Sequence, residues 1–177
     1  LADLFLLKKD LDAASAACRE ARAVFEKYPK EKKAEAEADL DELARNEGRI
    51  LAGRRRFGEA VKKYALAVRI AARTYGTENR REVAKFRIAA GEAELLARRP
   101  AAAMALFQKA LGNVVPGFLE KDPAKNPTAE QLYPENAIGE ALDGKARAWQ
   151  LMAAAAPKRA AADFLQKALD CYQLTGE

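Results

Sequence analysis

A recurring pattern of small and bulky residues organises this chain of 177 residues. A small residue, a bulky residue and a second small residue recur at offsets of four and three, which places each trio on one stripe of an α-helix. Two of the trios begin twelve residues after a glycine, Gly48 or Gly91. Helical units of this size bury an apolar face only by stacking on a neighbour. The trios are Ala14, Cys18 and Ala21; Ala60, Tyr64 and Ala67; Ala103, Phe107 and Ala110; and Ala161, Leu165 and Ala168.

The pattern predicts an all-α fold of about four stacked helical hairpins in a single domain, 1–177. The hairpins are expected at about 1–28, 30–75, 79–112 and 135–175. The second hairpin opens with one long charged helix, Lys30 to Arg54, and a break follows near Thr74 to Thr77. The chain begins in register partway through a first helix, which favours a fragment of a longer protein. In the fourth unit Trp149 stands where the earlier units have glycine, so an altered crossing or an end cap is expected there.

An insertion at 112–134 breaks the period. It carries four prolines and two glycines and cannot be one continuous helix. It also carries apolar residues such as Val115 and Phe118, which are unusual in a free linker. Two interpretations are open. The segment packs on the outer edge and holds the last hairpin, or it folds over the binding face and shapes the ligand site.

The composition favours helices and indicates the kind of environment in which the protein works. Half of the residues are apolar, many of them alanine, and aromatic residues make up only 7%. The net charge of +5 comes from 31 basic and 26 acidic residues that are largely interspersed, as on a solvated helical surface. Cys18 and Cys171 lie on apolar stripes and are expected to be reduced core residues of a cytoplasmic protein. No apolar run approaches the roughly 18 residues that a membrane span needs.

Catalytic chemistry is not expected. The chain has no histidine, so the usual general base and the commonest metal ligand are missing. Ser15 is its sole serine, and no glycine-rich phosphate loop is present. No enzyme, metal site or cofactor is therefore predicted. Nucleic-acid binding is also disfavoured, because the basic runs at 54–56, 80–81 and 98–99 lack interleaved aromatic residues for base stacking.

The glycine, the small residues and the aromatic wedge of each unit resemble the tetratricopeptide (TPR) repeat. That resemblance implies a right-handed superhelical α-solenoid with Gly48 and Gly91 at close helix crossings, where a larger residue overpacks by roughly 1–3 kcal/mol. The motifs VPGF, LYPEN and EALDGKARA resemble, over roughly 106–175, the terminal repeat of bacterial TPR proteins that carry a caspase-like CHAT domain. This second resemblance implies a regulatory or scaffold arm, and it carries over no catalytic residue.

A TPR-like array also implies a concave groove that binds a peptide or protein segment. Arg45 and Arg49 are one helical turn apart, and with Lys85 they are expected to clamp an acidic side chain or a chain-terminal carboxylate. Alternatively, the same face is filled by the rest of its own chain, which then serves as a spacer or a self-association surface. The partner and the oligomeric state are not specified by the sequence. The expected groove residues are Glu42, Arg45, Arg49, Lys85, Ile88, Glu92, Leu95 and Gln150.

Overall fold

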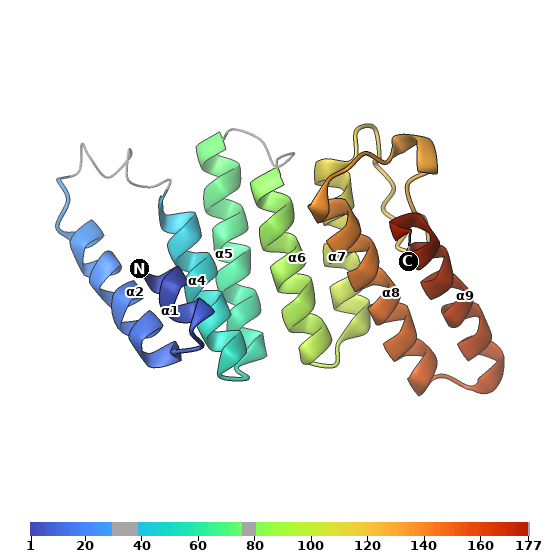
Figure 1. Ribbon diagram of the computed structural model, residues 1–177, viewed down its shortest axis with the longest axis horizontal. Helices are drawn as coiled ribbons and strands as arrows, with labels where there is room; N and C mark the ends of the chain where they lie inside the picture. Colours follow the sequence, from blue (N-terminus) through green and yellow to red (C-terminus); the bar gives the residue numbers. More distant parts are fainter. Residues whose placement is uncertain (30–38, 76–80, 177) are drawn as a thin grey trace. The chain divides into compact units, whose positions relative to one another are not determined.

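The chain is helical throughout its regular structure, as the sequence predicts. A computed structural model describes residues 1–29, 39–75 and 81–176, and within these ranges it contains eight α-helices, one 3-10 helix and no strand (Figure 1). The helices are α1 (Ala2–Leu7), α2 (Leu11–Glu26), α4 (Asp39–Gly53), α5 (Phe57–Tyr75), α6 (Arg81–Leu96), α7 (Pro100–Val114), η1 (Ala129–Gln131), α8 (Asn136–Ala155) and α9 (Lys158–Thr175).

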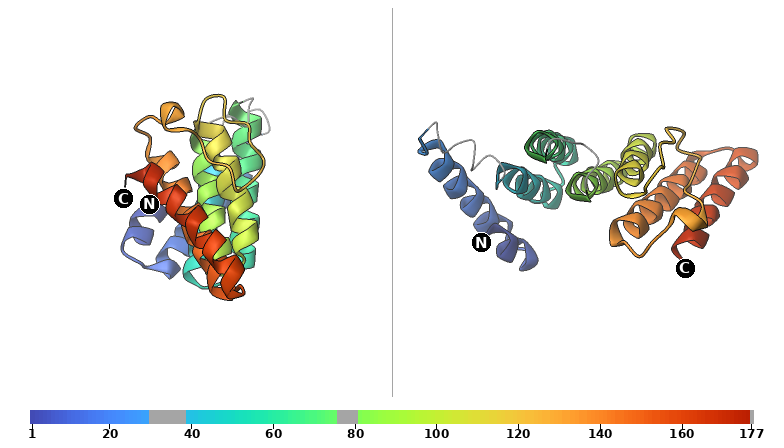
Figure 2. Two further views of the ribbon diagram at one scale, coloured as in Figure 1. Left: turned by 90° about the vertical axis from the view of Figure 1, so that its right-hand side faces the viewer. Right: turned by 90° about the horizontal axis from the view of Figure 1, so that it is seen from above.

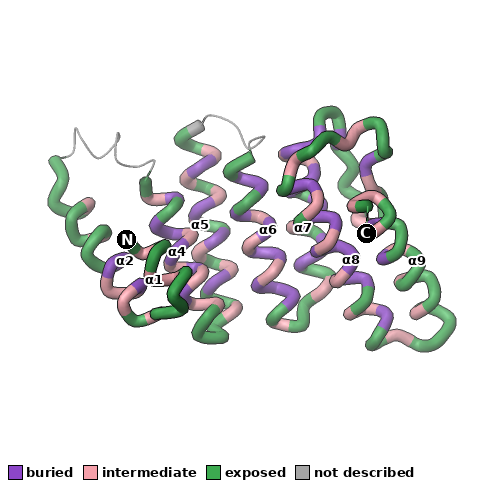
Figure 3. The backbone as a smooth tube through the Cα atoms, viewed as in Figure 1, coloured by how far each residue is buried: buried purple, intermediate pink, exposed green. Residues whose placement is uncertain are grey.

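The helices pack in succession within two compact units, 1–78 and 79–177. In the first unit α1 packs on α2, α2 on α4, and α4 on α5. In the second unit α6 packs on α7, α7 on α8, and α8 on α9, while α6 also contacts α8 (Figure 2). Buried positions follow the facing sides of α6, α7 and α8, whereas most of α9 is exposed (Figure 3). A continuous right-handed solenoid through all four helix pairs stays a prediction.

Two predicted boundaries meet the described residues only in part. Of the long helix expected over Lys30 to Arg54, the stretch Asp39–Gly53 is helical as α4, and 30–38 lie outside the described residues. The break expected at 74–77 begins later, because Thr74 and Tyr75 still belong to α5. Residues 76–80 also lie outside the described part of the chain.

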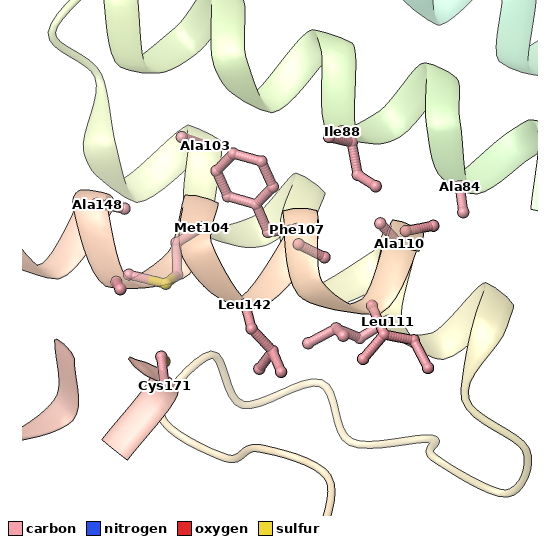
Figure 4. Packing of buried hydrophobic residues seen from close by; sticks show 14 of the residues in the cluster. Ala84, Ile88, Ala103, Met104, Phe107, Ala110, Leu111, Leu142, Ala148 and Cys171 are labelled. Atoms are coloured by element: carbon pink, nitrogen blue, oxygen red, sulfur yellow. The ribbon is translucent and has the colours of Figure 1, made fainter. Parts of the chain in front are cut away.

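The predicted close crossings are present at two glycines. A Cβ atom added at Gly48 would lie 2.7 Å from Cε1 of Tyr64, and one added at Gly91 would lie 2.7 Å from Cε1 of Phe107. Gly144 of α8 contacts the same Phe107 ring, so this wedge lies between two glycines on two different helices. All six residues of the second and third trios are buried, and Figure 4 shows Phe107 among its apolar neighbours.

The first and fourth trios differ from the prediction. Ala21 is exposed, because α1 spans only six residues and covers only part of the 16-residue α2. Leu165 is 52% exposed, although the pattern placed it as the wedge of the last hairpin. Trp149 occupies the position of the glycine and stacks on Phe164, with ring centroids 5.4 Å apart. The indole fills the space that a glycine leaves open, and Phe164 replaces Leu165 in the interface.

The turns inside the first three helix pairs share one geometry. Lys9, Arg55 and Arg98 each adopt a left-handed conformation with φ between 58° and 60°. In each turn this residue donates its N–H to the carbonyl three residues earlier, and the next residue donates to the carbonyl five residues before it. Such bonds satisfy the free carbonyls at a helix end. These residues are 46 and 43 positions apart, which matches the spacing of the trios, so the repeat extends to the backbone.

The insertion is ordered and begins later than predicted. Gly112 to Val114 still belong to α7, so the non-helical segment starts at Val115 and contains only the short η1. Val115 and Phe118 are buried, whereas Leu119 is 81% exposed. The segment is attached to α7, α8 and α9 by hydrogen bonds described below. Its contacts favour the interpretation in which it holds the last hairpin.

Candidate functional site

The two predicted arginines of α4 converge on one carboxylate. Arg49 Nη1 donates to Asp3 Oδ1 at 2.6 Å, and Arg45 Nη2 donates to the same oxygen at 3.3 Å. Between them in sequence, Asn46 Nδ2 donates to Asp3 Oδ2 at 3.2 Å. The helical spacing places the three donors on one face of α4, and α1 brings Asp3 against them. The sequence predicted a carboxylate ligand for the arginines but did not identify Asp3.

This cluster, Asp3 with Arg45, Asn46 and Arg49, keeps unused hydrogen-bonding capacity. Among the described residues, Arg45 Nε and Asn46 Oδ1 are buried and have no hydrogen-bond partner. Arg45 also pairs with Glu42 at 2.7 Å, so Glu42 lies beside the cluster. The side chains of Arg45, Arg49 and Asp3 are 26%, 36% and 52% exposed. Solvent therefore reaches the cluster.

A pocket of about 430 Å³ adjoins the cluster in the first unit. Asp3 and Asn46 contribute to its lining together with apolar residues of α1, α2 and α4, among them Val24 and Leu43. Glu20 and Asp39 also line it. The site thus combines an apolar pocket, whose lining also holds the carboxylates of Asp3, Glu20 and Asp39, with two guanidinium groups beside it. These features suit an apolar side chain that is followed by an acidic group.

The remaining predicted residues belong to the second unit. Lys85 and Gln150 are exposed, whereas Ile88 and Leu95 are each 7% exposed and pack in the helical interior. Glu92 pairs with Arg147, which also pairs with Asp143 at 2.8 Å. A clamp that joins Lys85 to Arg45 and Arg49 would need residues of both units, so it stays a prediction.

A buried polar cluster in the second unit was not identified from the sequence. Lys145 of α8 is 0% exposed, and its Nζ donates to Gln108 Oε1 at 2.6 Å, Asn126 Oδ1 at 2.6 Å and the Lys125 carbonyl at 2.8 Å. Gln108 also donates to the Glu120 carbonyl at 3.0 Å. Burial lowers the pKa of Lys145 to about 8. The cluster attaches the insertion to α7 and α8.

The cysteines lie where the sequence predicted them. Both are buried free thiols, and Cys18 packs with Ala14, Leu43 and Ile50. Burial raises the pKa of both thiols, which keeps them protonated and weakly nucleophilic. Asn126 donates to Cys171 Sγ at 3.4 Å and so links the insertion to α9.

The described residues offer neither a cluster of metal ligands nor a membrane-spanning helix. No group of three or more histidine, cysteine or carboxylate side chains in the described ranges is arranged to hold a metal ion. Within the same ranges, none of the helices has both the length and the apolar content that crossing a membrane requires.

Comparisons with protein-family models, with curated proteins and with solved structures gave no match. The likeness to TPR and CHAT-associated proteins therefore rests on the residue pattern alone.

Proposed function

We propose that this chain is a protein-interaction module whose α4 face binds an acidic, partly apolar segment of a partner protein. The observation that carries the proposal is the convergence of Arg45, Asn46 and Arg49 on one carboxylate beside an apolar pocket. Asp3 presents the same chemical group as an aspartate, a glutamate or a chain terminus of a partner. Its place between the arginines supports a carboxylate as the group that they bind.

Exchange of Asp3 for a partner's carboxylate is energetically accessible. Ion pairs that reach solvent typically contribute only about 0–1 kcal/mol to stability, so little is lost when Asp3 leaves. A partner that also places an apolar side chain in the pocket gains roughly 25 cal/mol for each Å² of apolar surface that it buries. When Asp3 leaves, Asn46 Nδ2 is also released and can donate to a carbonyl oxygen of the bound segment.

The repeat pattern supports a proposal about the larger protein to which this module belongs. The glycine–wedge contacts and the three matching turns are consistent with a TPR-type right-handed solenoid. The motifs VPGF, LYPEN and EALDGKARA favour the regulatory arm of a bacterial CHAT-type protein. In this proposal the chain acts by binding and holds no catalytic centre.

Fluorescence polarisation with designed peptides tests the proposal. The probe alternates leucine with glutamate, and its control replaces each glutamate with glutamine. We expect the acidic probe to bind, and Arg45→Gln with Arg49→Gln to weaken its binding about tenfold or more. Arg69→Gln, a matched change at an exposed position of α5, should leave binding unchanged. Equal binding of the acidic probe by the double variant and the wild type would refute this site.

Self-association is a second candidate function, and the exposed face of α9 favours it. Leu165 and Leu169 are 52% and 47% exposed on neighbouring turns of this helix. They occupy the positions at which α7 carries the buried Phe107 and Leu111. Light scattering over a range of concentrations should show dimers that Leu165→Lys with Leu169→Lys dissociates. A monomer at all concentrations contradicts this candidate.

A further inference from the structure

A second pocket in the first unit gathers basic side chains. It measures about 220 Å³ and is lined by residues of α2, α4, α5 and the turn between α4 and α5. Its lining includes the apolar residues Ile50 and Leu51. Its polar lining consists of Ser15, Arg19, Glu47, Arg54, Arg56 and Lys63.

The carboxylate in this pocket is already neutralised. Glu47 pairs with Lys63 Nζ at 2.5 Å through one oxygen and with Arg22 Nη2 at 2.6 Å through the other. Burial pushes the pKa of Glu47 upward, but hydrogen bonds from Lys63 and Arg22 outweigh that effect and lower it. Glu47 therefore stays ionised, and two cations balance its single charge. It offers little repulsion to an anion.

Two of the three arginines of the pocket, Arg19 and Arg54, are available to a ligand. Arg19 Nη1 donates to the Ser15 hydroxyl at 3.1 Å, which is an uncharged partner. Arg54 pairs at 2.5 Å with Asp12, whose side chain is 95% exposed. Arg56 pairs with Glu59 three residues later in the chain, and both side chains are 53% exposed. The solvent-exposed pair of Arg54 with Asp12 contributes little to stability and can rearrange around a stronger anion. The pair of Arg56 with Glu59 has two parallel hydrogen bonds, at 2.7 and 2.6 Å, and is the stronger of the two.

We propose that this pocket binds a phosphate group in its dianionic form. Guanidinium groups reach it from α2 and from the turn before α5, and the Ser15 hydroxyl can donate to a further oxygen. A tetrahedral phosphate presents three terminal oxygens, which suits several separate arginines better than a flat carboxylate with two. The volume accepts a phosphate and its point of attachment but is smaller than the roughly 300–1,000 Å³ of pockets for larger organic ligands.

The phosphate can come from a phosphorylated side chain of a partner or from free phosphate, and titrations followed by NMR distinguish these sources. The probes are inorganic phosphate, a short phosphoserine peptide and its unphosphorylated form. We expect saturable shifts of the Ser15 and Arg54 amide signals with both phosphate-bearing probes and none with the unphosphorylated peptide. Tighter binding of the phosphopeptide identifies a partner protein as the source, and equal binding identifies free phosphate. Binding of the phosphopeptide should weaken below about pH 6, where its dianion is protonated.

Variants and a competing ligand complete the test. Arg19→Gln with Arg54→Gln should weaken phosphate binding about tenfold, whereas Arg69→Gln on α5 should retain it. Circular dichroism checks that the variants are folded, and the amide shifts locate the site in the wild-type protein without any substitution. Absence of saturable shifts, undiminished binding by the double variant, or tighter binding of an oligonucleotide without terminal phosphate would overturn the proposal. None of these residues belongs to the Arg45 and Arg49 cluster, so the two proposals fail independently.

Discussion

At the scale of single residues, the buried Lys145 makes the stability of the fold depend on pH. Its ammonium group is fully buried, and its three hydrogen-bond acceptors are uncharged oxygens. Burial lowers its pKa from 10.5 to about 8. Between these two pH values the unfolded chain binds the proton more tightly than the folded chain does. The free energy of unfolding therefore rises as the pH increases from about 8 to 10.5.

The change attributable to Lys145 is up to about 3 kcal/mol at roughly 1.4 kcal/mol per pH unit. Urea unfolding of the wild type and of Lys145→Met at pH 7 and at pH 10 measures it, because the titrating groups that Lys145 does not influence contribute equally to both proteins. We expect the stability of the wild type relative to this variant to increase by about 2–3 kcal/mol at pH 10. A difference that does not change with pH contradicts the assignment.

Glycine substitutions test the close crossings. Gly91→Ala places a Cβ 2.7 Å from the Phe107 ring, and we expect a net loss of about 1–2 kcal/mol. Gly139→Ala in α8 meets no atom within 4 Å and should stabilise the helix by about 0.5–1 kcal/mol. Denaturant unfolding of the two variants compares the same chemical change with and without the wedge. Stabilisation by both substitutions would show that the wedge contact is loose.

Sequence spacing identified the wedges but not the buried lysine. Tyr64 and Phe107 stand out because small residues flank them at helical offsets, so their burial follows from the pattern alone. Lys145 lies on the apolar stripe of α8 between Ala141 and Trp149, four residues from each. That position was an available signal. Its partner Asn126 comes from the irregular insertion, whose path no periodicity predicts.

At the scale of elements, the sequence predicts the helix pairs and their turns better than it predicts the packing of α9 on α8. The spacing predicted four helix pairs, and charge and proline placement gave approximate ends. The sequence did not predict which side of α9 faces α8, because that orientation depends on the side chain at position 149. The Trp149 indole leaves no room for a wedge residue to contact the α8 backbone, as it does at a glycine, and the indole stacks on Phe164 instead. A pattern of small and bulky positions does not encode such a switch.

The repeated turn yields a prediction of its own. Arg98 holds φ near +59°, a region that disfavours side chains and favours glycine. Arg98→Gly should be more stable than Arg98→Ala by about 1 kcal/mol, because both remove the guanidinium but only glycine relieves the backbone. Thermal unfolding of the two variants isolates this backbone effect. Equal stability would mean that the turn is not strained.

At the scale of the whole molecule, the α4 cluster connects the fold to the proposed function. The first unit brings Asp3 of α1 to three donors of α4, next to an apolar pocket. The sequence predicted that Arg45 and Arg49 share one face of a helix, since one helical turn separates them. A partner's carboxylate as their ligand stays a prediction. The sequence could not predict that α1 supplies a carboxylate, because that contact joins positions more than forty residues apart.

Removal of that carboxylate tests the central claim most directly. If Asp3 stands in for a partner's acidic group, Asp3→Asn frees Arg45 and Arg49 and should tighten binding of the leucine–glutamate peptide about three- to tenfold. Asp163→Asn removes the carboxylate of another exposed ion pair, with Lys167 of α9, and should leave that affinity unchanged. Polarisation titrations of the three proteins give the answer. Unchanged or weaker binding by Asp3→Asn would contradict the claim.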